Sequence, residues 1–199
     1  MEFRVSNDGT RLSSEPASIR EIYGYTPGKP TCANNGRLAR RLVEHGVGFI
    51  PLCHRYWNIH GATYDEDIVN KTTAACFQTD QSIASLIQDL KHRSLLDTIM
   101  VIWASEFGRT PMRQPGPYLG REYHPRGYTI WMAGGDVQRG TVYGETDKFS
   151  YHAVVTPFDI TATALYMLGI DHTKLTYRFA GRNSRSTDVE GTVIKELLA

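Results

Sequence analysis

The sequence lacks several features that would assign it to a specialised class of protein. Its 199 residues include only three cysteines, which are far apart and odd in number, so neither a disulfide framework nor a Cys-x-x-Cys metal motif is present. No apolar run approaches the length of a membrane span, and no apolar segment of a secretion signal follows Met1. We therefore predict no membrane span, and because the formal net charge is only +1, we also predict no nucleic-acid partner.

Common catalytic motifs are also missing. The chain contains no His-Glu-x-x-His, P-loop, Gly-x-Gly-x-x-Gly or Gly-x-Ser-x-Gly segment, and it has no internal repeat. What remains is an ordinary globular composition, 41% hydrophobic and 22% charged, for which a single domain is the default expectation. Any chemistry must therefore come from residues that are scattered along the chain.

Helices and strands alternate over most of the chain. Residues 1–36 are rich in Ser, Gly, Pro and Asn and are expected to form an irregular N-terminal arm with one short helix at 17–23. The pattern then predicts helices over 37–45, 79–93 and 156–169, and strands over 47–52, 98–104 and 128–133. This alternation favours an α/β fold with a largely parallel central sheet flanked by helices.

The segment 98–104 is the most informative of these strands. It is apolar on consecutive positions, which predicts a strand that is buried on both faces of a sheet. Glu106 and Arg109 follow it directly, and ligands of open α/β sheets bind beyond the carboxyl ends of the strands. We therefore consider both side chains candidate metal or anion contacts, the alternative being a loop closed by a salt bridge.

Further polar side chains fall in the loops that flank the predicted strands. Imidazole and carboxylate together suit zinc, manganese or iron, whereas carboxylate and water alone suit calcium or magnesium. An arginine nearby could hold a sulfate or phosphate ester by paired hydrogen bonds. Each histidine has a simpler alternative role in packing or in loop hydrogen bonds. The candidates are His54, Asn58, His60, Glu106, Arg109, Glu122 and His124.

Several segments share their residues with one bacterial family. They lie at 39–47, 86–91, 106–111, 124–129, 131–135 and 175–182, and they include Glu-Phe-Gly-Arg-Thr-Pro and Ala-Gly-Gly. With them the region from about 37 to 199 resembles the domain of unknown function 1501 (DUF1501), which is abundant in planctomycetes and often described as sulfatase-like. The combination of these two blocks is specific to that family.

The resemblance implies an alkaline-phosphatase-like fold and a metal-dependent hydrolase of phosphate or sulfate esters. Such proteins usually bind two divalent metals, here zinc, manganese or calcium, and act on a small anionic ester. The family positions that face the metal correspond to Trp57-Asn-Ile-His-Gly61, to the loop from Glu106 to Arg109 and to Glu122-Tyr123. The resemblance thus implies catalytic roles for Glu106 and Arg109, and metal ligation by Asn58, His60, Glu106, Glu122 and His124.

The chain departs from the family pattern in three places. Asn58 stands where the family has Asp, and Tyr123 stands where it has His, so His124 could replace that ligand only if the loop shifts. Family members also carry an earlier region with an export signal and a Gly-Gly-Pro-Ser-His-like segment. We therefore expect 37–199 to be the C-terminal part of an alkaline-phosphatase-like domain whose N-terminal part is missing, in a protein of an exported family.

Two functional hypotheses follow from this pattern. The first is a sulfatase- or phosphatase-like hydrolase that is inactive or impaired as this truncated chain. The second is a non-catalytic, degenerate fragment that acts as a binding or interaction protein, and it predicts an exposed apolar face. Metal binding by the purified chain distinguishes the two hypotheses.

Overall fold

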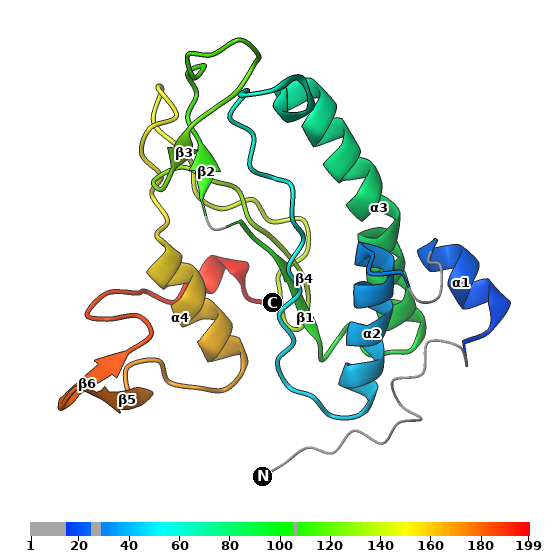
Figure 1. Ribbon diagram of the computed structural model, residues 1–199. Helices are drawn as coiled ribbons and strands as arrows, with labels where there is room; N and C mark the ends of the chain where they lie inside the picture. Colours follow the sequence, from blue (N-terminus) through cyan, green and yellow to red (C-terminus); the bar gives the residue numbers. More distant parts are fainter. Residues whose placement is uncertain (1–14, 25–28, 106) are drawn as a thin grey trace. The chain divides into compact units, whose positions relative to one another are not determined.

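The chain folds into two compact units, which we describe separately. The computed structural model describes residues 15–24, 29–105 and 107–199. The first unit is formed by residues up to Leu95 together with Arg113–Arg121, and the second by Leu96–Met112 together with Glu122–Ala199. Figure 1 labels the helices and strands of both units.

The first unit is built from helices. Helix α2 lies beside the long helix α3, and α1 packs near both of them (Figure 1). Polar caps define where the two main helices begin: the Thr31 side chain accepts from the Asn34 N–H, and that of Asp67 accepts from the Val69 N–H. The elements are α1 (Ala17–Tyr23), α2 (Cys32–Glu44), the short 3-10 helix η2 (Tyr64–Glu66) and α3 (Ile68–His92).

Charged and small polar side chains fill the contact between these helices. Arg37 and Arg40 of α2 are almost fully buried, with exposed fractions of 0% and 2%, and α3 contributes Ser82, Ser85 and Asp89. Buried arginines require buried counterions, because an uncompensated charge in a protein interior costs several kcal/mol, on the order of a small domain's stability. The first unit is therefore stabilised by ion pairs as well as by apolar contact.

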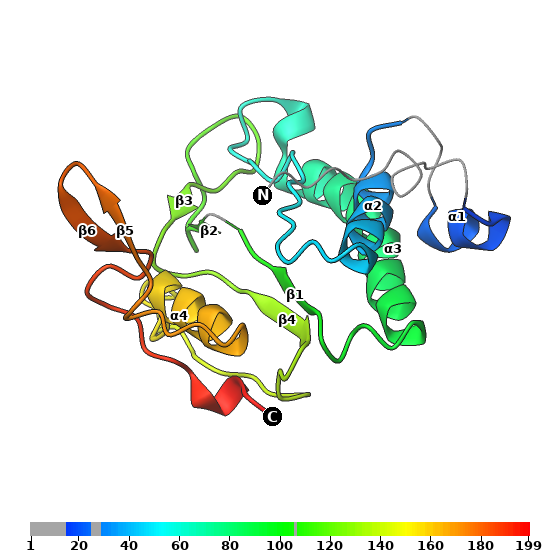
Figure 2. The same cartoon turned by 90° about the horizontal axis from the view of Figure 1, so that it is seen from below.

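In its described residues, the second unit contains three antiparallel strand pairs, one α-helix and one 3-10 helix. Strand β1 pairs with β4 over its whole length, from Met100 opposite Gly134 to Trp103 opposite Trp131, as Figure 2 shows. The remaining pairs are β2 with β3 and β5 with β6. The elements are β1 (Met100–Trp103), β2 (Gly108–Arg109), β3 (Tyr123–His124), β4 (Trp131–Gly134), α4 (Pro157–Met167), β5 (Thr176–Phe179), β6 (Arg182–Arg185) and the 3-10 helix η3 (Lys195–Leu197).

All of the predicted helices are present. The 17–23 helix has the bounds predicted for it, and α4 begins with the expected capping box, in which Thr156 and Asp159 exchange side-chain and backbone hydrogen bonds. Helices α2 and α3 begin at Cys32 and Ile68, earlier than predicted at 37 and 79, because their first turns lack an apolar stripe and depend on caps. Residues 32–36 of the expected irregular arm therefore belong to α2.

The predicted strands are only partly present. The 98–104 and 128–133 segments contain β1 and β4, but residues 47–52 form no strand, and Phe49 is 80% exposed. The prediction that the 98–104 strand is buried on both faces is wrong, because Ile102 is 39% exposed. An apolar run shows only the residue types, whereas the burial of a strand depends on which other segments of the chain cover it.

A largely parallel sheet is not found among the described residues. The strand pairs of that part of the chain are all antiparallel. The connection from β1 to β4 contains the short β2–β3 pair, and a parallel crossover would need a helix or similar element there. The alkaline-phosphatase-like α/β class, with its parallel central sheet, stays a prediction.

Candidate functional site

The segment that carries Asn58 and His60 is irregular but firmly held within the first unit. The Arg121 N–H donates to the Ile59 carbonyl at 3.0 Å, and the Tyr118 N–H donates to the Gly61 carbonyl at 3.3 Å. These two backbone bonds fix the loop that contains both candidates. The loop therefore has a defined shape although it belongs to no helix or strand.

Two glycines allow this close approach of backbone to backbone. A Cβ on Gly120 would lie 2.1 Å from the carbonyl carbon and oxygen of His60, and one on Gly61 would lie 2.6 Å from the Tyr118 oxygen. No other residue fits such distances without moving the backbone. The glycine that follows His60 in the family pattern thus has a packing role.

The His60 imidazole contacts the side chain of Gln114, which no sequence motif indicates. Its Nδ1 lies 2.9 Å from Oε1 of Gln114, and the ring is half-buried. In the tautomer that carries its proton on Nδ1, this nitrogen donates to Oε1 of Gln114. Asn58 is exposed, whereas Ile59 between them is buried.

His54 has a different environment. Trp57 Nε1 donates to His54 Nδ1 at 2.9 Å, while His54 Nε2 lies 3.2 Å from Oε1 of Gln78 on α3. Both ring nitrogens therefore engage protein groups, as expected for a histidine that packs and fixes a loop. This arrangement gives no support to metal ligation by His54.

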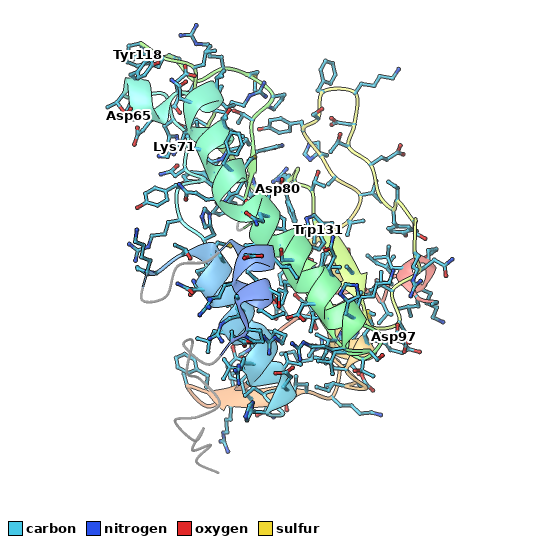
Figure 3. All side chains as sticks on the ribbon, turned by 90° about the vertical axis from the view of Figure 1, so that its right-hand side faces the viewer. Asp65, Lys71, Asp80, Asp97, Tyr118 and Trp131 are labelled. Atoms are coloured by element: carbon cyan, nitrogen blue, oxygen red, sulfur yellow. The ribbon has the colours of Figure 1, made fainter. Side chains whose placement is uncertain are left out.

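A cavity of about 500 Å³ opens near the beginning of α3. Asp65 and Lys71, both labelled in Figure 3, are among the side chains that line it, so its walls carry both signs of charge. Lys71 also lies 3.8 Å from the Glu66 carboxylate, which is part of the same wall. Of the candidate metal ligands that the structure describes, none lines this cavity.

In the second unit, the Glu-Phe-Gly-Arg segment contributes β2, and β3 is its antiparallel partner. Gly108 is opposite His124, and Arg109 is opposite Tyr123. A Cβ on Gly108 would lie 1.6 Å from the Gly127 carbonyl oxygen, so glycine is required at this position. Glu106, the first residue of the segment, lies outside the described residues.

Arg109 and Tyr123 form one side of this strand pair. The Arg109 guanidinium carbon lies 4.4 Å from the centre of the Tyr123 ring, a cation–π contact, and the Phe107 ring packs 5.6 Å from the same ring. The tyrosine that replaces the family's histidine therefore supports the arginine. Glu122, just before it, is exposed, and its backbone exchanges hydrogen bonds with Thr110.

His124 points to the other side and is buried. It is 4% exposed, and within the described part of the chain its Nε2 has no hydrogen-bond partner although that atom is inaccessible to solvent. The ring lies 4.8 Å from that of Tyr151 and against the Gly127 backbone. A buried polar atom normally has a partner, so this nitrogen is the least expected feature of the site.

The candidates are divided between the two units. Asn58 and His60 belong to the first, and Arg109, Glu122 and His124 belong to the second. Among residues 15–24, 29–105 and 107–199, no group of three or more His, Cys, Asp or Glu side chains is placed to hold a metal ion. The metal site therefore stays a prediction.

Sequence reasoning missed the side chains that surround the candidates. Gln114 contacts His60 across 54 positions of the chain, and Tyr151 contacts His124 from a later loop. Neither has a spacing or motif that indicates such a role, because both contacts are made by irregular segments. Only the tertiary structure identifies them.

A comparison with family models supports the resemblance seen in the sequence. The model described as "Protein of unknown function (DUF1501)" matches residues 4–198, so the chain belongs to this family. No curated protein and no solved structure matches the chain. Within the described residues, no helix is both long and apolar enough to cross a membrane.

Proposed function

We propose that this member of the DUF1501 family carries a divalent-metal site of the kind that hydrolyses phosphate or sulfate esters, in a form weakened by two substitutions. The observation that carries the proposal is the buried Nε2 of His124, which has no hydrogen-bond partner among the described residues. A buried ring nitrogen without a hydrogen-bond partner is suited to bind a metal ion or to accept a hydrogen bond from a ligand.

The donor set fits a borderline cation. Histidine nitrogen with glutamate oxygen suits zinc or manganese, and oxygen donors alone suit calcium. Within the second unit, the residues that would hold the ion are Glu106, Glu122 and His124. When bound, a divalent cation polarises an ester oxygen and lowers the pKa of its water.

Arg109 is the residue we assign to the anionic substrate. A guanidinium matches a sulfate or phosphate group by paired hydrogen bonds, and the Tyr123 ring holds this guanidinium in place at 4.4 Å. The same proposal includes catalytic roles for Arg109 and Glu106, a small anionic ester as substrate and the alkaline-phosphatase-like fold. So does export of the protein, as the family pattern implies.

Asn58 and Tyr123 are the reasons to expect a weakened site. An amide is a poorer ligand than the carboxylate that the family pattern has at position 58, and a phenol engaged with Arg109 replaces an imidazole at position 123. Both changes reduce the number of strong donors. We therefore expect metal affinity lower than that of a site with the full family pattern.

The alternative function is that of a non-catalytic binding protein. Its supporting observation is the apolar exposure in the 47–52 segment, where Phe49 is 80% and Leu52 is 47% exposed. Exposed apolar residues gathered in one segment indicate contact with another surface. Under this alternative, no tightly bound metal is expected.

The deciding experiment is the metal content of the purified protein after exposure to zinc, manganese and calcium followed by desalting. We expect retained metal in the parent protein and its loss in His124→Ala. His92→Ala is the matched control, because His92 is an exposed residue at the end of α3. Absence of stoichiometric metal from the folded parent protein, or equal metal in all variants, would refute the proposal.

A further inference from the structure

The β5–β6 hairpin has an unusual concentration of positive charge. Residues 174–185 contain four basic side chains and no acidic one, in a chain whose net charge is only +1. They are Lys174, Arg178, Arg182 and Arg185. We refer to residues 174–185 as the basic hairpin.

The backbone of the basic hairpin sorts these side chains onto two faces. Phe179 is opposite Arg182, and Tyr177 is opposite Ser184, so these four residues share one face. Arg178 and Arg185 occupy the other face. The turn is tight, with Ala180 and Gly181 both at positive φ, of 48° and 80°. In both Figure 1 and Figure 2 the hairpin extends away from α4 of the same unit.

Two large aromatic side chains on this surface are open to solvent. Tyr177 is 58% exposed and Phe179 is 71% exposed, and every residue of β5 is exposed. Aromatic rings beside arginine are the composition typical of recognition surfaces. Both rings lie on the same face of the hairpin as Arg182, so this face offers an apolar surface next to a positive charge.

The positive charges are little neutralised by neighbours. Arg182 is 3.9 Å from Asp188 and Lys174 is 3.2 Å from Asp171, but all four side chains are at least 46% exposed, and such surface pairs are weak. Arg178 and Arg185 form no ion pair within the described part of the chain. The basic hairpin therefore presents its charge to an incoming anion.

We propose that the basic hairpin binds an anionic polysaccharide, with sugar rings on Tyr177 and Phe179 and ester groups on Arg182. The proposal rests on the proposed function, because it identifies the substrate as a polymer that carries sulfate or phosphate esters. Arginine pairs with either group by the same bidentate geometry. The four basic side chains of a single hairpin form a smaller surface than the wide basic surfaces with which proteins bind nucleic acid.

The test is binding of the whole protein to dextran sulfate, to dextran phosphate and to neutral dextran, with EDTA present so that no metal is required. We expect binding to one or both charged polymers, weakening with salt, and none to neutral dextran. Arg182→Gln, and separately Tyr177→Ala combined with Phe179→Ala, should each reduce affinity at least tenfold. All three side chains are exposed, so the variants should keep the parent's circular dichroism.

Matched controls are available in the same unit. Arg139→Gln removes an exposed arginine that lies 3.8 Å from Asp97, and Phe149→Ala removes an aromatic ring that is 81% exposed. Neither should change binding. Equal loss in control and hairpin variants, no binding to the charged polymers, or tighter binding to single-stranded DNA would overturn the proposal. Since EDTA is present, loss of the metal site leaves this result unchanged, so the two proposals fail separately.

Discussion

Glu15 controls the stability of the first unit, and its replacement by glutamine is the sharpest test of the structure. Its Oε1 accepts from Arg37 at 2.9 Å, Arg40 at 2.7 Å and Arg41 at 2.8 Å. Its side chain is 4% exposed. A single carboxylate thus compensates three guanidinium groups that α2 brings together.

The expected loss follows from how deeply each of these arginines is buried. Arg40 still pairs with Glu44 and Asp89, and Arg41 is partly open to solvent. Arg37 is fully buried, and it loses the charge of its Glu15 partner. Removing one partner of a buried ion pair lowers the free energy of unfolding by about 3–5 kcal/mol. Because other ion pairs of the cluster remain, we expect Glu15→Gln to cost about 3 kcal/mol.

Thermal unfolding followed by far-ultraviolet circular dichroism measures this loss, because the first unit holds the helices α2 and α3. A change of that size lowers the Tm by roughly 6–12 °C for a chain of this length. Glu66→Gln is the control, since Glu66 pairs with Lys71 only at 3.8 Å and is 39% exposed. If Glu15→Gln unfolds within about 1 °C of the parent, the buried ion cluster does not stabilise the unit.

The same carboxylate predicts a pH dependence. Burial alone would raise the pKa of Glu15, but hydrogen bonds from Arg41 and Arg40 outweigh it and hold the pKa below its ordinary value of 4.5. A carboxyl whose pKa is lowered by folding contributes stability above its unfolded pKa and loses it as pH falls through the folded value. Below about pH 4.5, the stability of the parent should fall more steeply than that of Glu15→Gln.

Three further substitutions test separate contacts by chemical denaturation. Thr156→Ala removes the N-terminal cap of α4 and should cost about 1 kcal/mol. Tyr23→Phe removes a buried hydroxyl that donates to Asp89 at 3.0 Å and should cost about 1–2 kcal/mol; no loss would contradict that bond. Gly108→Ala places a methyl group 1.6 Å from the Gly127 oxygen, and should cost more than about 2 kcal/mol by separating β2 from β3.

Much of the local structure could be predicted from the sequence where local signals decide it. The α4 start followed from Thr156, Pro157 and Asp159, because a capping box is formed by residues three positions apart. The same reasoning missed the first turns of α2 and α3. There the caps Thr31 and Asp67 precede stretches without an apolar stripe, so periodicity placed both starts too late.

The arrangement of strands could not be predicted in the same way. Alternation of helices and strands favoured parallel pairing, yet β1 and β4 pair antiparallel, because the chain between them returns through a short strand pair. Burial could not be predicted from the sequence either, because Ile102 lies within an apolar run but is 39% exposed. Pairing and burial depend on distant segments, about which residue type alone says little.

The candidate site shows what a family motif does and does not imply. Gly61 and Gly108 are required because backbone packs directly against them, so their presence is explained by folding alone. Arg109 is likewise held by the Tyr123 ring. Packing explains the presence of these three residues, but it does not explain the buried Nε2 of His124. Function should therefore be sought first at His124: if His124→Ala binds as much metal as the parent protein, the hydrolase proposal loses its main support.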